Sequence, residues 1–199
     1  MLKTFTISCA AGLAMMTAAV AGPTVSGKSA PAVAPMPAPT CEGGISYDNL
    51  SVDWSHSWLD GGADDLNGVD VNLHKTIVDK LFFHGSAAWT DSTGDDWGFT
   101  AGLGYALPLM KNIDLVAEAG GFWSDGSDSG YYIFPHLRGK WGCFELHAGA
   151  KFADPSDGDN FWEAHVNAFY QIAQNTDVHV GGIFSEFGDT LLVGLRYKF

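Results

Sequence analysis

His74 and His84 are the residues whose type and spacing come nearest to a metal site in this sequence. They lie on either side of Val78-Asp79-Lys80, which favours a tight turn, so two strands joined there would place the imidazoles opposite each other. Facing histidines can bind zinc or copper. They can equally form hydrogen bonds with carboxylates or water, and the spacing supplies no third ligand. We therefore assign no metal firmly and expect no cofactor.

A second candidate group is a set of charged residues in segments of alternating polarity. Counting back from a turn at Gly142-Cys143 places Lys140 opposite Glu145. The same count places Arg138 opposite His147. Buried charges need partners. Interlocked ion pairs are therefore favoured over a catalytic or conducting role for these residues.

Closure of such strands into a barrel would bring the last segment beside the first, with Arg196 at about the depth of Asp53. The acidic residues expected to face the interior are Asp53, Asp70, Asp114, Glu118, Glu145, Glu163 and Asp177. The predicted charge network in the lumen consists of Asp53, Arg138, Lys140, Glu145, His147 and Arg196.

Cys41 and Cys143 are the thiols that remain once an export signal is removed. Both are expected at the periplasmic end of the molecule, where the environment is oxidising. A disulfide could then tie the N-terminal arm to the turn at Gly142-Cys143. Two free thiols are the alternative.

The elements that must position these residues are strands. Alternation of apolar with polar or small side chains, as in Val69, Val71 and Leu73, puts apolar groups on one face. Ten segments fit this pattern, and each is close to the length of about 9–11 residues that crosses a bilayer as a tilted strand. They are residues 49–58, 66–77, 81–90, 97–107, 113–124, 130–141, 144–153, 161–172, 176–185 and 190–199. Eight strands, with two hairpins misread, are the alternative, and Pro135 predicts a local bulge.

The assignment of an inward and an outward face to each strand is supported by residues that were not used to make it. All seven tryptophans fall on the apolar face, and six of the seven histidines fall on the other, with His56 as the exception. Apolar side chains outside and polar ones inside are typical of a transmembrane barrel. Acidic, glycine-rich connections alternate with tight turns, and the last acidic connection is short. This is the pattern of outer loops and periplasmic turns.

The N-terminal region predicts export. Residues 1–21 have a cationic start, an uncharged apolar stretch and Ala19-Val20-Ala21 before Gly22, which is typical of a cleaved signal peptide. Residues 22–42 form a Pro/Ala-rich periplasmic linker, and residues 43–199 form the barrel domain. An even number of strands then leaves both termini in the periplasm.

Composition excludes several classes of function. Removing Lys3 with the signal changes the net charge from −13 to −14, which argues against nucleic-acid binding. After the signal no apolar run approaches 18 residues, the length of a transmembrane helix. A membrane-spanning mature chain would therefore cross as strands.

The last residues carry a family resemblance. Gly194, Tyr197 and Phe199 match the C-terminal assembly signal of small Gram-negative outer-membrane barrels, although Leu192 stands where that signal has a polar residue. Together with the strand pattern over residues 44–199, the chain resembles the OmpA-like, OmpX-like and opacity-type porin superfamily. The resemblance implies an all-β, antiparallel up-and-down barrel in the cell outer membrane. It also implies that the outer-membrane assembly machinery reads this segment.

We therefore expect a non-enzymatic envelope barrel, either structural or a narrow small-solute porin. It would be a monomer in contact with outer-membrane lipid and lipopolysaccharide. An enzyme of the outer-membrane protease or lipid A deacylase type is one alternative, but the loop ends, which offer His56 and aspartates, have no H-x-S motif with a nearby Glu. A surface adhesin acting through the acidic loops is the other.

Overall fold

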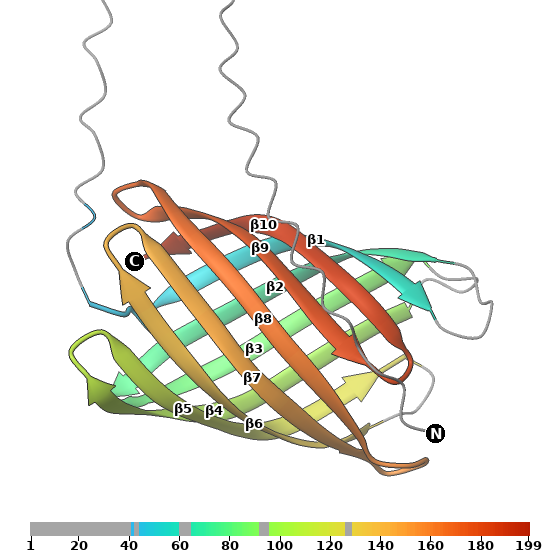
Figure 1. Cartoon of the computed structure of the whole chain (residues 1–199). Coiled ribbons are helices and arrows are strands. Elements are labelled where there is room, and N and C mark those ends of the chain that lie inside the picture. The colour runs from blue at the N-terminus through green and yellow to red at the C-terminus, as the bar shows by residue number, and fades with distance from the viewer. Residues whose placement is uncertain (1–40, 42–43, 60–64, 92–95, 126–128) are drawn as a thin grey trace, which may run out of the picture. The chain divides into compact units, whose positions relative to one another are not determined.

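The chain folds into a closed barrel of ten antiparallel strands (Figure 1). The computed structural model describes residues 41, 44–59, 65–91, 96–125 and 129–199. The strands are β1 (Asn49–Leu59), β2 (Leu66–Val78), β3 (Leu81–Asp91), β4 (Asp96–Met110), β5 (Ile113–Ser124), β6 (Ser129–Trp141), β7 (Phe144–Pro155), β8 (Phe161–Ala173), β9 (Thr176–Ser185) and β10 (Gly188–Lys198). Each strand pairs with the next, and β10 pairs with β1. The prediction of ten strands is confirmed, and the eight-strand alternative is wrong.

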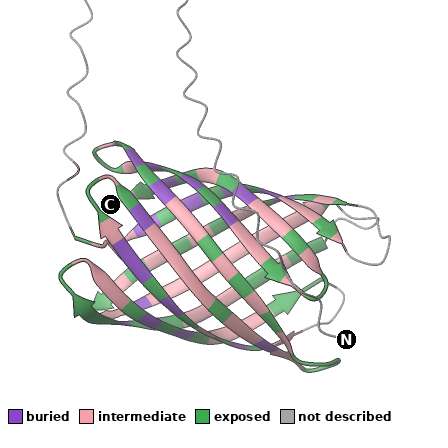
Figure 2. Ribbon diagram, in the orientation of Figure 1, coloured by how far each residue is buried: buried purple, intermediate pink, exposed green. Residues whose placement is uncertain are grey.

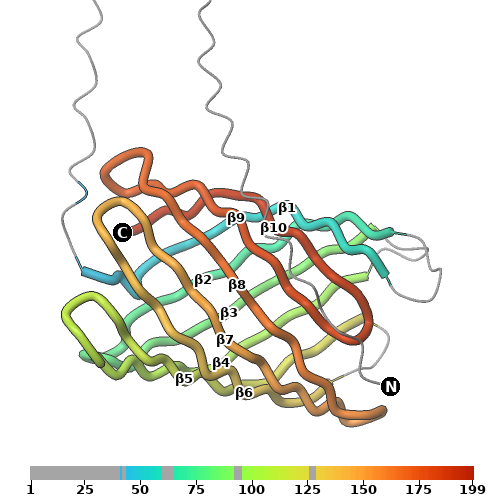
Figure 3. Tube along the Cα trace, in the orientation of Figure 1, coloured from blue at the N-terminus to red at the C-terminus, as the bar shows by residue number. Residues whose placement is uncertain are grey.

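The two ends of the barrel differ in their connections. At one end, here called the turn end, two-residue turns join β2 to β3, β4 to β5, β6 to β7 and β8 to β9 (Figure 3). The C-terminus lies at the same end, where the Lys198 N–H donates to the carbonyl of Asn175. The opposite end, the loop end, carries the remaining connections. The predicted signal peptide, most of the predicted linker and parts of three acidic connections lie outside the described residues.

At two prolines the structure differs from the expected course of the strands. The turn expected at 108–112 is shorter, because β4 continues to Met110 with a register shift between Pro108 and Met110. Proline is tolerated in a strand at such an irregularity. The bulge expected at Pro135 is wrong. The pairing of β6 with β7 skips Phe134 and Pro135, but the register is the same on both sides of the gap.

The two faces of the sheet have the reverse of the polarity found in a water-soluble barrel. Among the described residues, twelve polar or charged side chains are buried, compared with seven apolar ones. Exposed and buried residues alternate along the strands (Figure 2). Leu50, Val52 and Trp54 of β1 are exposed, whereas Ser51 and Asp53 between them are buried. Such an exterior needs an apolar solvent, because water-soluble monomers rarely expose continuous apolar surface.

The tryptophan and histidine side chains lie on the faces of the sheet that the sequence predicted. Six of the seven tryptophans are exposed on the outer face, and Trp89, the seventh, is half-buried opposite Trp97. The six histidines predicted to point inward all line the lumen. No helix long and apolar enough to cross a membrane occurs among the residues that the structure describes.

A small apolar core closes part of the turn end. Phe82, Ala106 and Val116 pack together there, and Tyr47 stacks on Phe82 at 4.8 Å between ring centroids. Gly104 makes room for this core, because a Cβ atom at this position would overlap the ring of Phe82.

We therefore expect Gly104→Ala to lower the free energy of unfolding by about 1–3 kcal/mol, the usual effect of overpacking. Gly98→Ala on the same strand is the control, since its Cβ would come no closer than 3.9 Å to a neighbouring atom. Denaturant titration of the refolded barrel measures both variants. Equal losses would show that the space around Gly104 does not matter.

Candidate functional site in the barrel lumen

The barrel encloses a cavity of about 410 Å³ that is lined by residues from all ten strands. Most of the residues that line it have polar or ionisable side chains, because the inward face of each strand carries histidine, acidic, amide or hydroxyl groups, and aromatic rings such as Phe122 and Phe134 line the space between them. Gly98 of β4 also lines the cavity, and its lack of a side chain leaves space there. A polar cavity of this kind can hold water and small polar solutes.

Glu145 is the centre of an ionic cluster near the turn end. Arg138 Nη2 donates to its Oε1 at 2.6 Å, and Arg196 Nη2 donates to its Oε2 at 2.7 Å. The same Oε1 lies 2.6 Å from His147 Nε2. The carboxylate and both guanidiniums are almost completely buried. Two cations therefore share one carboxylate across the lumen.

Asp177 balances the second guanidinium. Arg196 Nε donates to its Oδ2 at 2.7 Å, and Lys198 Nζ donates to its Oδ1 at 2.8 Å. Arg196 also lies over the ring of Phe169, with 3.8 Å between the guanidinium carbon and the ring centroid. The predicted network did not include Asp177. The sequence predicted that Asp177 points inward, but it did not predict that Arg196 is its partner.

The structure brings together only four of the six residues of the predicted network, which are Arg138, Glu145, His147 and Arg196. Lys140 is opposite Glu145 in the register, but its ammonium donates to the carbonyl of Gly44 at 3.2 Å.

Asp53 also lies apart from the ionic cluster. The register places Arg196 opposite Ser51 and Asp53 opposite Gly194, two residues away, so the expected proximity of Asp53 and Arg196 is corrected. Asp53 is bound by His179 and by the hydroxyl of Ser51.

Residues 44–48, here called the strap, enter the turn end of the lumen. Arg138 Nη2 donates to the carbonyl of Ser46 at 3.0 Å, and the guanidinium lies 4.3 Å from the ring centroid of Tyr47. The Tyr47 hydroxyl donates to Asp114 Oδ2 at 2.8 Å. Burial raises the pKa of Tyr47 above its ordinary value, and the neighbouring carboxylate acts in the same direction, so this donor remains protonated.

Both ends of the strap are tied to the barrel. Asp48 accepts a hydrogen bond from the Thr76 N–H at 2.9 Å and lies 3.0 Å from the Lys75 ammonium. Burial alone would raise the pKa of Asp48, but these two donors outweigh it and lower the pKa below its ordinary value. In the structure Cys41 forms a disulfide with Cys143, which lies in the turn between β6 and β7.

Two further ionic groups lie along the lumen. Lys151 Nζ and His165 Nε2 contact Glu163 Oε2 at 3.0 and 3.1 Å. His74 and His84 are directly opposite each other, as expected, and Glu118 lies beside both. Sequence reasoning placed Glu118 inside the barrel but did not join it to the histidines, because it comes from a strand that pairs with neither of theirs.

The residues of the C-terminal motif lie at the seam between β10 and β1. Tyr197 and Phe199 point outward and are about half exposed, whereas Gly194 packs inward against Val52 and Asp53. The exposed rings at the turn end suit contact with the membrane interface.

Comparison with known proteins identifies the fold. No family model matches the chain, and no curated protein matches it either. The KdgM porin, in a complex with disordered oligogalacturonate, is similar with a TM-score of 0.50 at 10% identity, over 75% of this chain and 99% of that chain. An outer membrane channel from Pseudomonas putida F1 aligns with a TM-score of 0.49 at 10% identity, over 76% of this chain and 94% of that chain. The chain thus has the outer-membrane β-barrel fold of the small porins, as the sequence resemblance predicted.

Proposed function

We propose that this chain is an integral outer-membrane barrel that acts as a narrow small-solute porin, and that its turn end is closed at rest. The observation that carries the proposal is the polar cavity lined by all ten strands. A barrel with a purely structural role can fill its interior with side chains. This one retains space lined by groups that bind water and polar solutes.

The closed state follows from the contacts at the turn end. The Arg138–Glu145–Arg196 cluster crosses the lumen, and the strap lies against Arg138 through Ser46 and Tyr47. Passage of a solute requires these groups to move. The disulfide opposes that movement, because it holds the chain before the strap on the β6–β7 turn.

Conductance of the mature chain in a planar bilayer tests the proposal. We expect small, infrequent openings in the oxidised protein. Removing the disulfide by reduction or by Cys41→Ser should raise the conductance severalfold, and so should Tyr47→Ala, which removes the ring beneath Arg138. Tyr170→Ala is the matched control, since this tyrosine lies on the outer face.

The outcomes separate porin from structural barrel. Stepwise conductance that increases in Tyr47→Ala but not in Tyr170→Ala supports the porin. Silence of the wild type and of every variant would favour an envelope barrel with a structural role. The similar porin structures are not described as enzymes, and we propose no catalytic role for the lumen groups.

The placement in the envelope is part of the same proposal. With the short turns facing the periplasm, both the strap and the C-terminus lie on that side. The outer face contacts lipid and, around the loops, lipopolysaccharide, and the barrel acts as a monomer. Gly194, Tyr197 and Phe199 would present the segment that the assembly machinery reads.

A further inference from the structure

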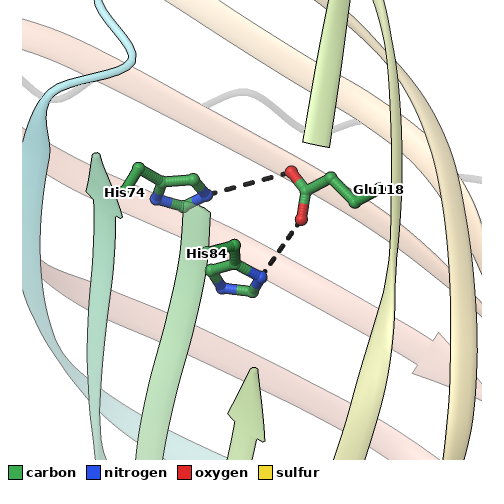
Figure 4. A group of neighbouring side chains, drawn as sticks. All are labelled: His74, His84 and Glu118. Atoms are coloured by element: carbon green, nitrogen blue, oxygen red, sulfur yellow. Dashed lines mark ion pairs between the residues drawn. The ribbon is translucent and has the colours of Figure 1, made fainter. Parts of the chain in front are cut away.

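His74, His84 and Glu118 converge on one point of the lumen wall (Figure 4). His74 lies on β2 and His84 on β3, directly opposite in the register, and their rings stack with 4.5 Å between centroids. Directly opposed residues of antiparallel strands have neighbouring Cβ atoms, so the backbone pairing itself keeps the two imidazoles close together.

Glu118 reaches the histidines from β5, across the intervening strand β4. The register places Gly102 of β4 beside His84 and Gly104 beside Glu118. Neither glycine has a side chain to separate the groups. A Cβ atom at Gly102 would lie only 2.6 Å from the Tyr132 hydroxyl. Strand β4 therefore places no side chain of its own between the carboxylate and the two rings, and the ring of Phe82 and the hydroxyl of Tyr132 use the space over the two glycines.

The donor atoms have a spacing that suits a single ion. Glu118 Oε2 lies 3.1 Å from His84 Nδ1, and Oε1 lies 3.8 Å from His74 Nε2. One ligand atom from each of the three residues can be chosen so that all lie within 4.8 Å of one another. Zinc bonds of about 2.0–2.2 Å in a tetrahedral site put neighbouring ligand atoms about 3.3 Å apart. Small side-chain rotations would close the difference.

The charge around Glu118 differs from that around the other two glutamates of the lumen. Glu145 is paired with Arg138, and Glu163 is paired with Lys151. Within the described part of the chain, the ion-pair partners of Glu118 are all histidines: His74, His84 and His136. Its side chain is only 4% exposed. A buried carboxylate without a permanent cation is costly, and a divalent ion would neutralise it.

The hydrogen bonding of His74 is also incomplete. Its Nδ1 atom is buried and has no hydrogen-bond partner among the residues that the structure describes. Metal-bound histidines usually have a partner on the second nitrogen that sets the tautomer. Nε2 is the nitrogen that faces the carboxylate, and none of the described residues binds Nδ1 to hold the ring in that tautomer against a metal.

We propose that His74, His84 and Glu118 bind one divalent transition-metal ion of the zinc class. Two imidazoles and one carboxylate suit zinc and leave a fourth position open. That position faces the cavity, because all three residues line it. Water or an anionic group of a solute would complete the coordination. The site does not depend on whether the lumen conducts.

Zinc titration of the full mature chain, refolded in detergent without a histidine tag and stripped with a chelator, tests the site. Competition with a chromophoric zinc indicator should give one zinc ion per chain. His84→Ala and Glu118→Gln should each weaken binding by more than about tenfold. His165→Ala is the matched control, because this histidine pairs with Glu163 in a separate lumen group. It should leave zinc affinity unchanged.

Cobalt supplies a readout that a merely structural role would not change. The visible absorption of bound Co²⁺ should report low coordination number and histidine ligands in the wild type, and it should be lost in His84→Ala. His84→Gln serves as a second variant if His84→Ala does not refold, with strand content checked by circular dichroism. No zinc binding at millimolar metal, or equal affinity in the wild type and Glu118→Gln, would overturn the proposal.

Discussion

Glu145→Gln lowers the free energy of unfolding by about 3–5 kcal/mol, the expected loss when one member of a buried ion cluster is removed. The substitution keeps the size of the side chain but removes the charge that Arg138 and Arg196 share. Both guanidiniums are only 3% exposed, so neither can recover full hydration without moving. Urea unfolding of the barrel, refolded in lipid vesicles or detergent, measures the loss.

Glu163→Gln is the control for this prediction. Its carboxylate pairs with Lys151 and His165, but it is 19% exposed to the lumen, compared with 4% for Glu145. We expect a loss of about 1 kcal/mol or less, because water can replace part of a solvated ion pair. Adding Arg138→Met to Glu145→Gln should restore part of the stability, since it removes one unpaired cation. Similar losses in the two single variants would contradict the central role of Glu145.

Leu103→Arg is expected to cost about 2–4 kcal/mol, the penalty for an arginine on the lipid face at the middle of a bilayer. Leu103 lies at the centre of β4, points outward and is 51% exposed. The penalty arises from moving a charge into hydrocarbon, so it tests what surrounds the barrel. Folding free energies measured in lipid vesicles give the difference.

Leu109→Arg provides a comparison within the same strand. Leu109 is 52% exposed on the outer face, but it lies one residue from the turn-end limit of β4. Near the membrane interface the same change costs only about 0–1 kcal/mol. A water-soluble barrel would show no dependence on depth, so equal and small effects at both positions would refute a membrane location.

Sequence periodicity was sufficient to predict the strands and their faces. The period-two alternation at Val69, Val71 and Leu73 determines which face of β2 meets lipid, and a one-residue slip would invert every side chain. A turn of three residues at 78–80 predicted the pairing of His74 with His84, and the structure reaches the same pairing by a two-residue turn and a register shift between Thr76 and Val78. The turn at Gly142-Cys143 was predictable for a similar reason. Gly142 has a φ of +58°, a backbone conformation that two-residue turns use and that residues with a side chain adopt less readily.

Contacts between strands that are not neighbours were not predictable in this way. The position of Arg196 relative to Asp53 depends on every hairpin register around the barrel, and a shift of two residues was enough to change its partner. Glu118 meets His84 across β4, where the residues beside them, Gly102 and Gly104, have no side chains.

Tyr47 shows a second limit of the sequence pattern. It precedes β1, so the alternation of the strands does not determine where it points. Its contacts with Phe82 and Asp114 depend on how the strap folds back into the lumen.

The pairing of β10 with β1 has a consequence for biogenesis. Those strands are the last and the first of the sheet, and eleven residue pairs join them, from Asn49 with Lys198 to Leu59 with Gly188. Until β10 is in place, both edge strands of the sheet expose unpaired N–H and C=O groups. These groups promote aggregation in water, and in lipid they have no hydrogen-bond partners. No intermediate with fewer strands is self-contained. Closure of the first strand on the last is therefore the step that makes the sheet stable in either solvent.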